Sequence, residues 1–452
     1  METKQLVKST SGIRGVVGNG LDPVMITAYG AAFGTFLKKG KVVVGRDSRP
    51  SGEMVMRAVV SGLMAVGMDV IEIGVVPTPT VEIAVKKLKA AGGICVTASH
   101  NPSEWNALKF FNAYGEFISP DQYKGLDAIF NSGNFAYTTW DKIGKLSAQS
   151  HWIDEHIKMT LALKTVNKPA IKKRKFRIVV DAINGAGSIA LPKMLEQMGC
   201  KVIRINCKGD GDFVHKPEPI PAHLTQLGRE VKKHKAHLGL AADPDADRLV
   251  IVDETGKPIN EELTLTIAVK QVLKKSKGAT VINLSTSSTT ASVAKALGSP
   301  VYYSKVGESN VVQMMRERKA IIGGEGNGGV IYPTCHAGRD CLVAAALVLS
   351  CLAEEKLSVK SLVGTFPNYY IIKTKASLPG DFSSRLARFE TEAQTLLGGA
   401  TIDRRDGLRF DFDKGWVQIR SSNTEPIYRL IVETSEKALT ESLLQQVIDF
   451  FK

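Results

Sequence analysis

Three aspartates, Asp243, Asp245 and Asp247, alternate along one short stretch that directly follows an apolar run. Carboxylates at alternating positions of a tight loop can converge on one hard cation. A calcium EF-hand loop is a rival interpretation, because Glu254 falls at its twelfth position. Arg248, however, stands at the sixth position, where that loop requires glycine, and residues 249–252 read as a buried strand. A Mg²⁺ site with positions open to a phosphate oxygen is therefore the favoured prediction, and a plain acidic turn is the alternative.

A serine at the end of another apolar run is a candidate nucleophile or phosphate carrier. Residues 93–96 read Gly-Ile-Cys-Val and are followed by Thr-Ala-Ser-His-Asn-Pro at 97–102. The strand cannot continue through this stretch, because Pro102 donates no backbone hydrogen bond and Asn101 favours a turn. The hydroxyl of Ser99 is thus expected on a loop at the carboxyl end of a strand, where open α/β sheets bind ligands. Taken alone, this stretch fits an ordinary strand-to-loop turn better than a nucleophile or a phosphate carrier.

Three further loops carry side chains suited to anions and sugars. The stretch Arg-Ser-Ser-Asn-Thr at 420–424, with Arg429 after it, predicts a phosphate-binding loop, since arginine binds phosphate through two parallel hydrogen bonds. In the glycine-rich stretch 324–329, Glu325 and Asn327 can hydrogen-bond sugar hydroxyls. Residues 11–15 can bring Arg14 and backbone amides close to an anion. Each stretch also fits a loop without a ligand, and none of them is a Walker loop.

The elements that must position these loops form a pattern that occurs three times. Strands alternate with helices in each copy, and the last strand of each copy ends in a polar loop. The expected strands lie at 41–47, 69–73 and 93–96, then at 176–181, 201–205 and 237–242, then at 280–284, 301–303 and 320–324. From about residue 368, short strands alternate with two helices. We therefore predict the α/β class, with three similar α/β domains of mixed sheet and a smaller C-terminal α+β domain.

The predicted domain boundaries follow from the same pattern. The four predicted domains are residues 1–150, which contain Ser99; 151–256, which contain the three aspartates; 257–367, which contain Glu325; and 368–452, which contain Arg420. The polar stretch 131–149 and the region around residues 366–368 are the expected linkers.

Composition limits the cellular setting and the partners. The chain has 452 residues, and no apolar run approaches the roughly 20 residues that a membrane-spanning helix needs. The N-terminus lacks the apolar core of a signal peptide, and the six cysteines form no C-x-x-C pair, so a reduced cytoplasmic protein is expected. The formal net charge of +14 suits nucleic acid or a small anionic substrate equally well. Because the basic runs are short and no nucleic-acid-binding motif is present, we expect neither nucleic acid nor a membrane as a partner.

Taken together, the loops resemble those of the α-D-phosphohexomutase family, in the same order and over essentially the whole chain. The resemblance implies four domains around a central cleft, a phosphorylated Ser99 that also contributes to the metal site, and Mg²⁺ bound by the three aspartates. It further implies roles for residues that match the family's motifs. These are Arg14, His100, Lys109 and Arg248 around the phosphoserine, Glu325 and Asn327 in the sugar-binding loop, and Arg420, Ser422, Asn423, Thr424 and Arg429 in the phosphate-binding loop.

The chain departs from the family pattern at several positions. Many relatives have serine where this chain has Asn327 and histidine where it has Gly329; Glu308 stands where a histidine is frequent, and Ala107 where glycine is usual. The usual histidine base is thus missing, and Glu308 and His336 are the candidates to replace it. The Gly-Glu-Gly-Asn-Gly-Gly loop, with His336-x-Gly338-Arg339-Asp340 after it, resembles the branch usually assigned as phosphoglucosamine mutases.

The resemblance implies a phosphohexomutase, an isomerase that moves a phosphoryl group between the 6- and 1-positions of a hexose or hexosamine phosphate. Ser99 would pass its phosphoryl group to glucosamine 6-phosphate, and the resulting 1,6-bisphosphate would turn and return the other phosphate. A phosphomannomutase or phosphoglucomutase of the same family is the nearest alternative. A metal-dependent phosphatase and a non-catalytic sugar-phosphate-binding protein are the alternatives from other classes.

Overall fold

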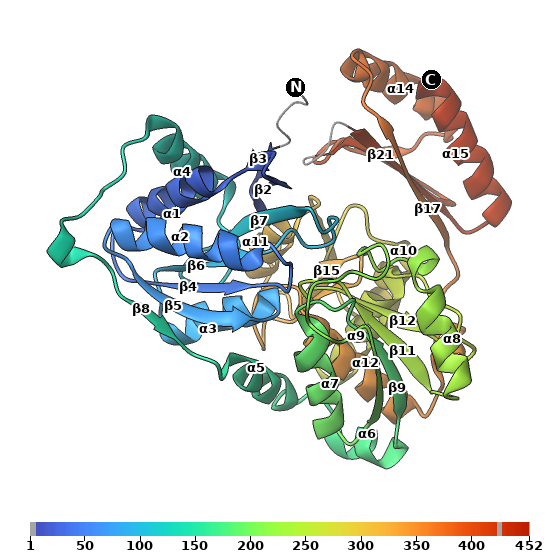
Figure 1. The fold of residues 1–452 in the computed structure, drawn as a ribbon. Helices are drawn as coiled ribbons and strands as arrows, with labels where there is room; N and C mark the ends of the chain where they lie inside the picture. Colours follow the sequence, from blue (N-terminus) through green and yellow to red (C-terminus); the bar gives the residue numbers. More distant parts are fainter. Residues whose placement is uncertain (1–5, 423–426, 452) are drawn as a thin grey trace.

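The computed structural model describes residues 6–422 and 427–451. Its first three units each contain a four-stranded motif with the same strand order, in which the first three strands are parallel and the fourth is antiparallel (Figure 1). The motifs are β5-β4-β6-β7, β10-β9-β11-β12 and β14-β13-β15-β16. The predicted fold class is confirmed, and the mixed character of each sheet comes from the antiparallel fourth strand.

The strands and helices of the first unit match the predicted pattern closely. They are β1 (Leu6–Ser9), β2 (Gly12–Val17), β3 (Gly20–Leu21), α1 (Pro23–Leu37), β4 (Lys41–Arg46), α2 (Gly52–Ala65), β5 (Asp69–Val75), α3 (Thr78–Leu88), β6 (Gly92–Val96), β7 (Trp105–Phe111), α4 (Pro120–Ser132) and β8 (Leu146–Ala148). The predicted linker 131–149 needs a correction, because β8 pairs with β5 as an edge strand of the first sheet. All three residues of β8 are exposed, so the strand leaves no apolar pattern in the sequence.

The second and third units follow each other along the chain. The second contains α5 (Trp152–Leu161), α6 (Lys168–Arg174), β9 (Arg177–Asp181), α7 (Gly187–Gln197), β10 (Lys201–Ile205), α8 (Thr225–Lys233), β11 (Leu238–Ala242) and β12 (Leu249–Val252). The third contains α9 (Glu262–Lys275), β13 (Thr280–Asn283), α10 (Ser288–Ala296), β14 (Val301–Ser304), α11 (Glu308–Glu317), β15 (Ile322–Glu325), β16 (Gly329–Ile331), α12 (Cys341–Glu355) and α13 (Val359–Val363).

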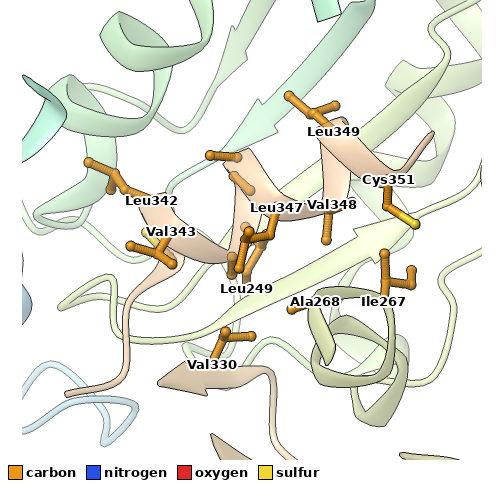
Figure 2. Packing of buried hydrophobic residues seen from close by; sticks show 14 of the residues in the cluster. Leu249, Ile267, Ala268, Val330, Leu342, Val343, Leu347, Val348, Leu349 and Cys351 are labelled. Carbon is orange, nitrogen blue, oxygen red and sulfur yellow. The ribbon is translucent and has the colours of Figure 1, made fainter. Parts of the chain in front are cut away.

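One helix joins the cores of the second and third units. Residues 341–353 of α12 are all buried, and a helix that is apolar on every side must be enclosed by protein. Figure 2 shows its side chains beside Leu249 of β12, Ile267 of α9 and Val330 of β16. The two units therefore share one hydrophobic core, and the loops that they carry are held in a fixed relation.

The C-terminal unit is a five-stranded antiparallel sheet in the order β17-β21-β20-β19-β18, with α14 and α15 beside it (Figure 1). Its elements are β17 (Tyr370–Ser377), α14 (Phe382–Leu396), β18 (Thr401–Asp403), β19 (Leu408–Phe412), β20 (Gly415–Ser421), β21 (Ile427–Thr434) and α15 (Lys437–Phe451). A separate core that includes Phe389, Phe410 and Val447 holds it together. Within the described ranges, no helix of the protein is long and apolar enough to cross a membrane.

The candidate residues lie at equivalent places in the first three units. In each of these units a loop joins a central strand to its antiparallel neighbour: 97–104 between β6 and β7, 243–248 between β11 and β12, and 326–328 between β15 and β16. In the C-terminal unit, Arg420 and Arg429 lie on β20 and β21, and residues 423–426 between these strands lie outside the described ranges. Glu325 is the last residue of β15, immediately before its loop. In the first three units the fold thus places one polar loop at the end of a buried strand.

Candidate active site

Ser99 lies in a strained and buried loop. Its φ of 51° is in the left-handed region, which a residue other than glycine seldom adopts. The backbone N–H of Ser99 donates to Oγ1 of Thr97 at 3.0 Å, and Thr97 donates in turn to Oδ2 of Asp47 at 2.6 Å. Strain of this kind persists only where the surroundings enforce it, and it concentrates at functional sites.

Arg49 provides that enforcement, although the sequence analysis did not select it. Its fully buried guanidinium pairs with Asp47 at 3.0 Å and donates to the carbonyl oxygens of Ser99 and Asn101, both at 2.7 Å. It also donates to the carbonyls of Pro102 and Trp105. One side chain therefore holds the whole loop from Ser99 to β7. The only sequence signal was the polar stretch that follows β4.

The hydroxyl of Ser99 faces the aspartate loop. Its Oγ donates to Oδ2 of Asp243 at 3.3 Å. The three aspartates are buried, and each offers a carboxylate oxygen within 4.8 Å of the others. Oδ1 of Asp245 and Oδ1 of Asp247 are buried and make no hydrogen bond within the described part of the chain. Such oxygens suit a hard cation, so the residues present fit Mg²⁺.

Two basic side chains accompany the aspartates. Nζ of Lys109 lies 2.6 Å from Oδ2 of Asp245 and 3.6 Å from Oδ2 of Asp247. Burial opposes the charge of Lys109, but these two carboxylates raise its pKa above the usual value, so it stays protonated. Arg248 lies within 3.8 Å of both Asp243 and Asp247. Together they place two positive side chains against the aspartate loop that Ser99 faces.

His100 and Arg14 also lie close to the Ser99 loop. Nδ1 of His100 lies 3.4 Å from Oγ of Ser99. Burial and the charges of Arg248 and Arg14 lower the pKa of His100 well below its usual value, so its ring is neutral near pH 7. Arg14 donates to Oδ1 of Asn101 at 3.3 Å, which places it beside the same loop.

The sugar-loop residues are held by a network that the sequence analysis missed. Oε1 of Glu325 accepts from Asn283 at 2.8 Å and from the backbone N–H of Gly307 at 2.9 Å. Its Oε2 accepts from Arg339 at 2.7 Å. Oδ1 of Asn327 accepts from the backbone N–H of Gly329 at 3.1 Å, which fixes the Asn327 side chain within the loop. Arg339 belongs to the stretch His336-x-Gly338-Arg339-Asp340, which the sequence linked to a branch of the family but not to these contacts.

The two candidate bases have different surroundings. His336 is almost fully buried, with Nδ1 3.1 Å from Glu82 and Nε2 3.0 Å from Asp340. Burial lowers the pKa of His336, but the two carboxylates outweigh it and raise the pKa to about 10, so the ring is already protonated near pH 7 and does not fit the role of base. Burial and the charge of Glu82 raise the pKa of Glu308 to about 8, which is close to neutral pH, where a general base works best.

His336 belongs to a buried group that also contains Thr80, Glu82, His156 and Asp340, named here the His336 cluster. Oδ2 of Asp340 lies 2.8 Å from Nε2 of His156, and Nδ1 of His156 lies 2.9 Å from the hydroxyl of Thr80. His156, His336 and Asp340 are spaced closely enough to bind a metal ion, but direct hydrogen bonds already pair these groups. The cluster joins α3, α5 and the start of α12, which belong to three different units.

The phosphate loop brings two arginines together. Arg420 on β20 and Arg429 on β21 are paired across the two antiparallel strands. Burial lowers the pKa of Arg420, and the charge of Arg429 acts in the same direction. A bound anion would compensate the positive charges of both arginines. The backbone N–H of Ser422 donates to the carbonyl of Ile427 at 2.8 Å, next to the ends of β20 and β21. Asn423 and Thr424 lie outside the described residues.

Comparison with known proteins gives matches over the whole chain. Four models of the phosphoglucomutase/phosphomannomutase family match: alpha/beta/alpha domains I, II and III at residues 5–137, 154–256 and 260–370, and the C-terminal domain at 381–450. A phosphoglucomutase/phosphomannomutase from Thermococcus kodakarensis is 37% identical and covers 96% of each chain. A probable phosphoglucosamine mutase from Methanopyrus kandleri is 35% identical and covers 98% of this chain and 97% of its own. The crystal structure of a phosphoglucomutase/phosphomannomutase family protein from Burkholderia thailandensis has a TM-score of 0.86 at 27% identity and covers 99% of this chain and 98% of its own.

Proposed function

We propose that this chain, which belongs to the phosphoglucomutase/phosphomannomutase family, converts glucosamine 6-phosphate to glucosamine 1-phosphate through phosphorylated Ser99 and a 1,6-bisphosphate. Membership of this family makes the chain a phosphohexomutase, and therefore an isomerase. The six cysteines are unpaired, which suits the cytoplasm as its working compartment. The substrate and the role of Ser99 are the new parts of the proposal.

The geometry of the Ser99 loop carries the proposal. The hydroxyl of Ser99 faces the three aspartates, and Lys109 and Arg248 pair with the same carboxylates. A phosphoryl group on this oxygen would therefore meet both positive side chains. When bound, Mg²⁺ would be held by the aspartates and the phosphorylated Ser99, and would neutralise charge on the transferring group.

The residues of the chain account for the remaining steps. A sugar hydroxyl attacks the phosphorus on Ser99, the bond from phosphorus to Oγ breaks, and the hydroxyl proton passes to a base, for which Glu308 is the candidate. Arg420 and its loop hold the phosphate that does not react. After the bisphosphate turns, Oγ of Ser99 attacks the second phosphorus, and the sugar oxygen leaves and takes back the proton. Ser99 thus ends the cycle phosphorylated, as it began.

Relatives named as phosphoglucosamine mutases support the choice of an amino sugar. The Methanopyrus kandleri protein carries this name, whereas the Thermococcus kodakarensis protein is named for glucose and mannose phosphates. The Gly-Glu-Gly-Asn-Gly-Gly form of the sugar loop points to the first group. A phosphoglucomutase or phosphomannomutase activity of the same site remains the second candidate.

The test compares glucosamine, glucose and mannose phosphates side by side with the phosphorylated enzyme and Mg²⁺. We expect the highest kcat/KM for glucosamine phosphate and no net release of inorganic phosphate. Equal or reversed specificity constants would overturn the choice of sugar. Stoichiometric release of phosphate without isomerisation would indicate a phosphatase, and tight binding without turnover would indicate a sugar-phosphate-binding protein.

A further inference from the structure

We propose that Arg339 is a positioning residue that couples the sugar loop to the aspartate loop, and that Glu308 and Gly329 are the residues that accommodate it. The functional part of this inference rests on the proposed function, because it assigns Glu325 to the sugar and Asp247 to the metal. The geometric part stands on the contacts alone. It gives one physical explanation for two positions at which the sequence departs from the family pattern.

Three carboxylates from three different elements meet at one guanidinium. Nη1 of Arg339 donates to Glu325 at the end of β15 at 2.7 Å, and Nη2 donates to Asp247 in the aspartate loop at 2.6 Å. Nε of Arg339 lies 3.0 Å from Oε2 of Glu308, the first residue of α11. The planar fork of arginine can serve several carboxylates at fixed angles, and the point charge of lysine cannot. Arg339 therefore sets the distance between a sugar-loop carboxylate and an aspartate of the metal site.

The backbone around Arg339 is also fixed. Its N–H donates to Oε1 of Glu308 at 3.2 Å, so Glu308 contacts both the backbone and the side chain of the same residue. The next residue, Asp340, caps α12 by accepting from the N–H groups of Leu342 and Val343. Because α12 lies in the core shared by the second and third units, Arg339 projects from a rigid support.

Gly329 leaves room for the Arg339 side chain. A Cβ added at this position would overlap Cδ of Arg339 and lie 2.9 Å from Oδ1 of Asn327. Gly329 lies in strand β16, and its φ is not in the left-handed region, so the backbone does not itself require glycine here. The side chain of Arg339 makes the tightest of these contacts and is therefore the main reason for the glycine. A larger residue at this position would displace the guanidinium from Glu325 and Asp247.

A double-mutant cycle tests the geometric part. Gly329→Ala should lower the Tm more in the wild-type background than in Arg339→Ala, where the tightest contact of the added Cβ is already gone and only that with Asn327 remains. Gly380→Ala is the matched control glycine, because a Cβ there meets nothing within 4 Å and its φ is ordinary. Arg229→Ala is the control arginine, exposed on α8. Additive losses of Tm in the cycle would contradict the claim that Arg339 is what requires glycine at this position.

Two binding measurements and a rescue variant test the coupling. Arg339→Ala should raise the KM for the sugar phosphate and weaken Mg²⁺ binding measured by titration, because Glu325 and Asp247 lose the group that holds them. The loss of one charge-assisted hydrogen bond, about 10- to 150-fold, is the upper bound for each effect. Arg339→Lys should recover little of either, whereas a purely structural positive charge would be rescued by lysine. A variant whose KM changes while its Mg²⁺ affinity stays at the wild-type value would refute the coupling.

The outcomes separate this inference from the proposed function. If the wild-type protein proved to lack mutase activity, the proposed function would fail. The Tm cycle and the Mg²⁺ titration would still test the role of Arg339, because neither measurement depends on mutase activity. If the wild type is active and the cycle is additive, only the inference about Arg339 fails. If lysine restores both affinities, Arg339 acts as a simple counter-ion, and the positioning role is wrong.

Discussion

At the scale of single residues, the aspartate loop shows how a charged site is balanced before any ligand binds. Oδ2 of Asp245 accepts from Lys109 and from the hydroxyl of Thr78, both at 2.6 Å. Burial and the charges of its two neighbours raise the pKa of Asp243 well above the usual value, while Arg339 and Lys109 overcome burial and keep the pKa of Asp247 low. The carboxylates are therefore not equivalent, and a divalent cation would remove the repulsion between them.

Asp245→Asn tests this site with little change in volume. It removes one negative charge from the predicted metal site and the ion pair to Lys109, so Mg²⁺ affinity and turnover should fall together, by about 10- to 150-fold. Equilibrium titration with Mg²⁺ and the initial rate are the two measurements. Asp413→Asn, on an exposed turn, is the control and should match the wild type. Full activity after exhaustive chelation of metal would show that the aspartates serve another purpose.

Which residues could be read from the sequence depends on how far apart their partners lie. Ser99 and the three aspartates stand in short contiguous motifs, so their residue types and spacing pointed to them. Arg49 contacts Ser99 across fifty positions of the chain, and Arg339 contacts Asp247 across ninety-two. The sequence around Arg339 pointed to a family branch, but the contacts of both arginines could not be read from it, because only the fold creates them. His336 was chosen as a possible base on residue type, and its two carboxylate partners exclude that role.

At the scale of elements, the His336 cluster ties together helices from three units. Glu82 and Thr80 lie on α3, His156 on α5, and Asp340 is the cap of α12. Burying these charges costs free energy unless they are paired, and each ring nitrogen of His336 has a carboxylate partner. The cluster therefore stabilises the arrangement of the units only while His336 carries its proton.

Stability against pH tests the cluster. The folded-state pKa of His336 is about 10, above its ordinary 6.5, so the stabilisation is complete below about pH 6.5 and is lost as the pH rises towards 10. The difference in Tm between the wild type and His336→Gln should therefore be large at pH 6 and shrink steadily up to pH 10. His151→Gln, exposed at the start of α5, is the control. A difference that stays constant across this range would mean that the proton on His336 does not link the helices.

Elements with an apolar pattern were the predictable ones. The buried strands β4, β9 and β13 begin within one residue of their expected positions, because their valines and isoleucines form short apolar runs. The exposed edge strand β8 has no such run and was assigned to a linker. Helix α12 has too many apolar residues to show which face packs where, so its place between two units appears only in the structure.

At the scale of the whole molecule, the proposed mechanism requires four loops from four units to act on one substrate. The first three units are linked by contacts of Ser99, Lys109 and Arg339 with the aspartate loop. The C-terminal unit contacts the third unit through polar bonds, among them Ser285 to Gln418 at 2.6 Å and the N–H of Ser288 to Glu433 at 2.8 Å. The phosphate loop is thus carried by a unit with its own core, joined to the rest by a polar interface. The boundaries proposed from the sequence remain a prediction for the domains as folding units.

Arg420→Ala tests whether this loop serves both half-reactions. In a mutase the distal phosphate is the 6-phosphate in one direction and the 1-phosphate in the other, so the variant should weaken use of both by comparable factors. Loss of one charge-assisted hydrogen bond corresponds to about 10- to 150-fold. Single-turnover rates in both directions and an assay of released bisphosphate are the measurements, with Arg388→Ala, exposed on α14, as the control. A defect in one direction only, with no additional bisphosphate release, would contradict a two-way clamp.

The intact mass of the protein tests the central claim most directly, because the account requires a transferable phosphate on Ser99. Purified wild-type protein incubated with the 1,6-bisphosphate and Mg²⁺ should gain the mass of one phosphoryl group, located at Ser99 by peptide mapping. Addition of excess sugar monophosphate should remove part of it as bisphosphate, and Ser99→Ala should gain nothing and lose nearly all turnover. A phosphate found elsewhere, or a Ser99→Ala variant with a tenth or more of wild-type turnover, would contradict the phosphoserine mechanism.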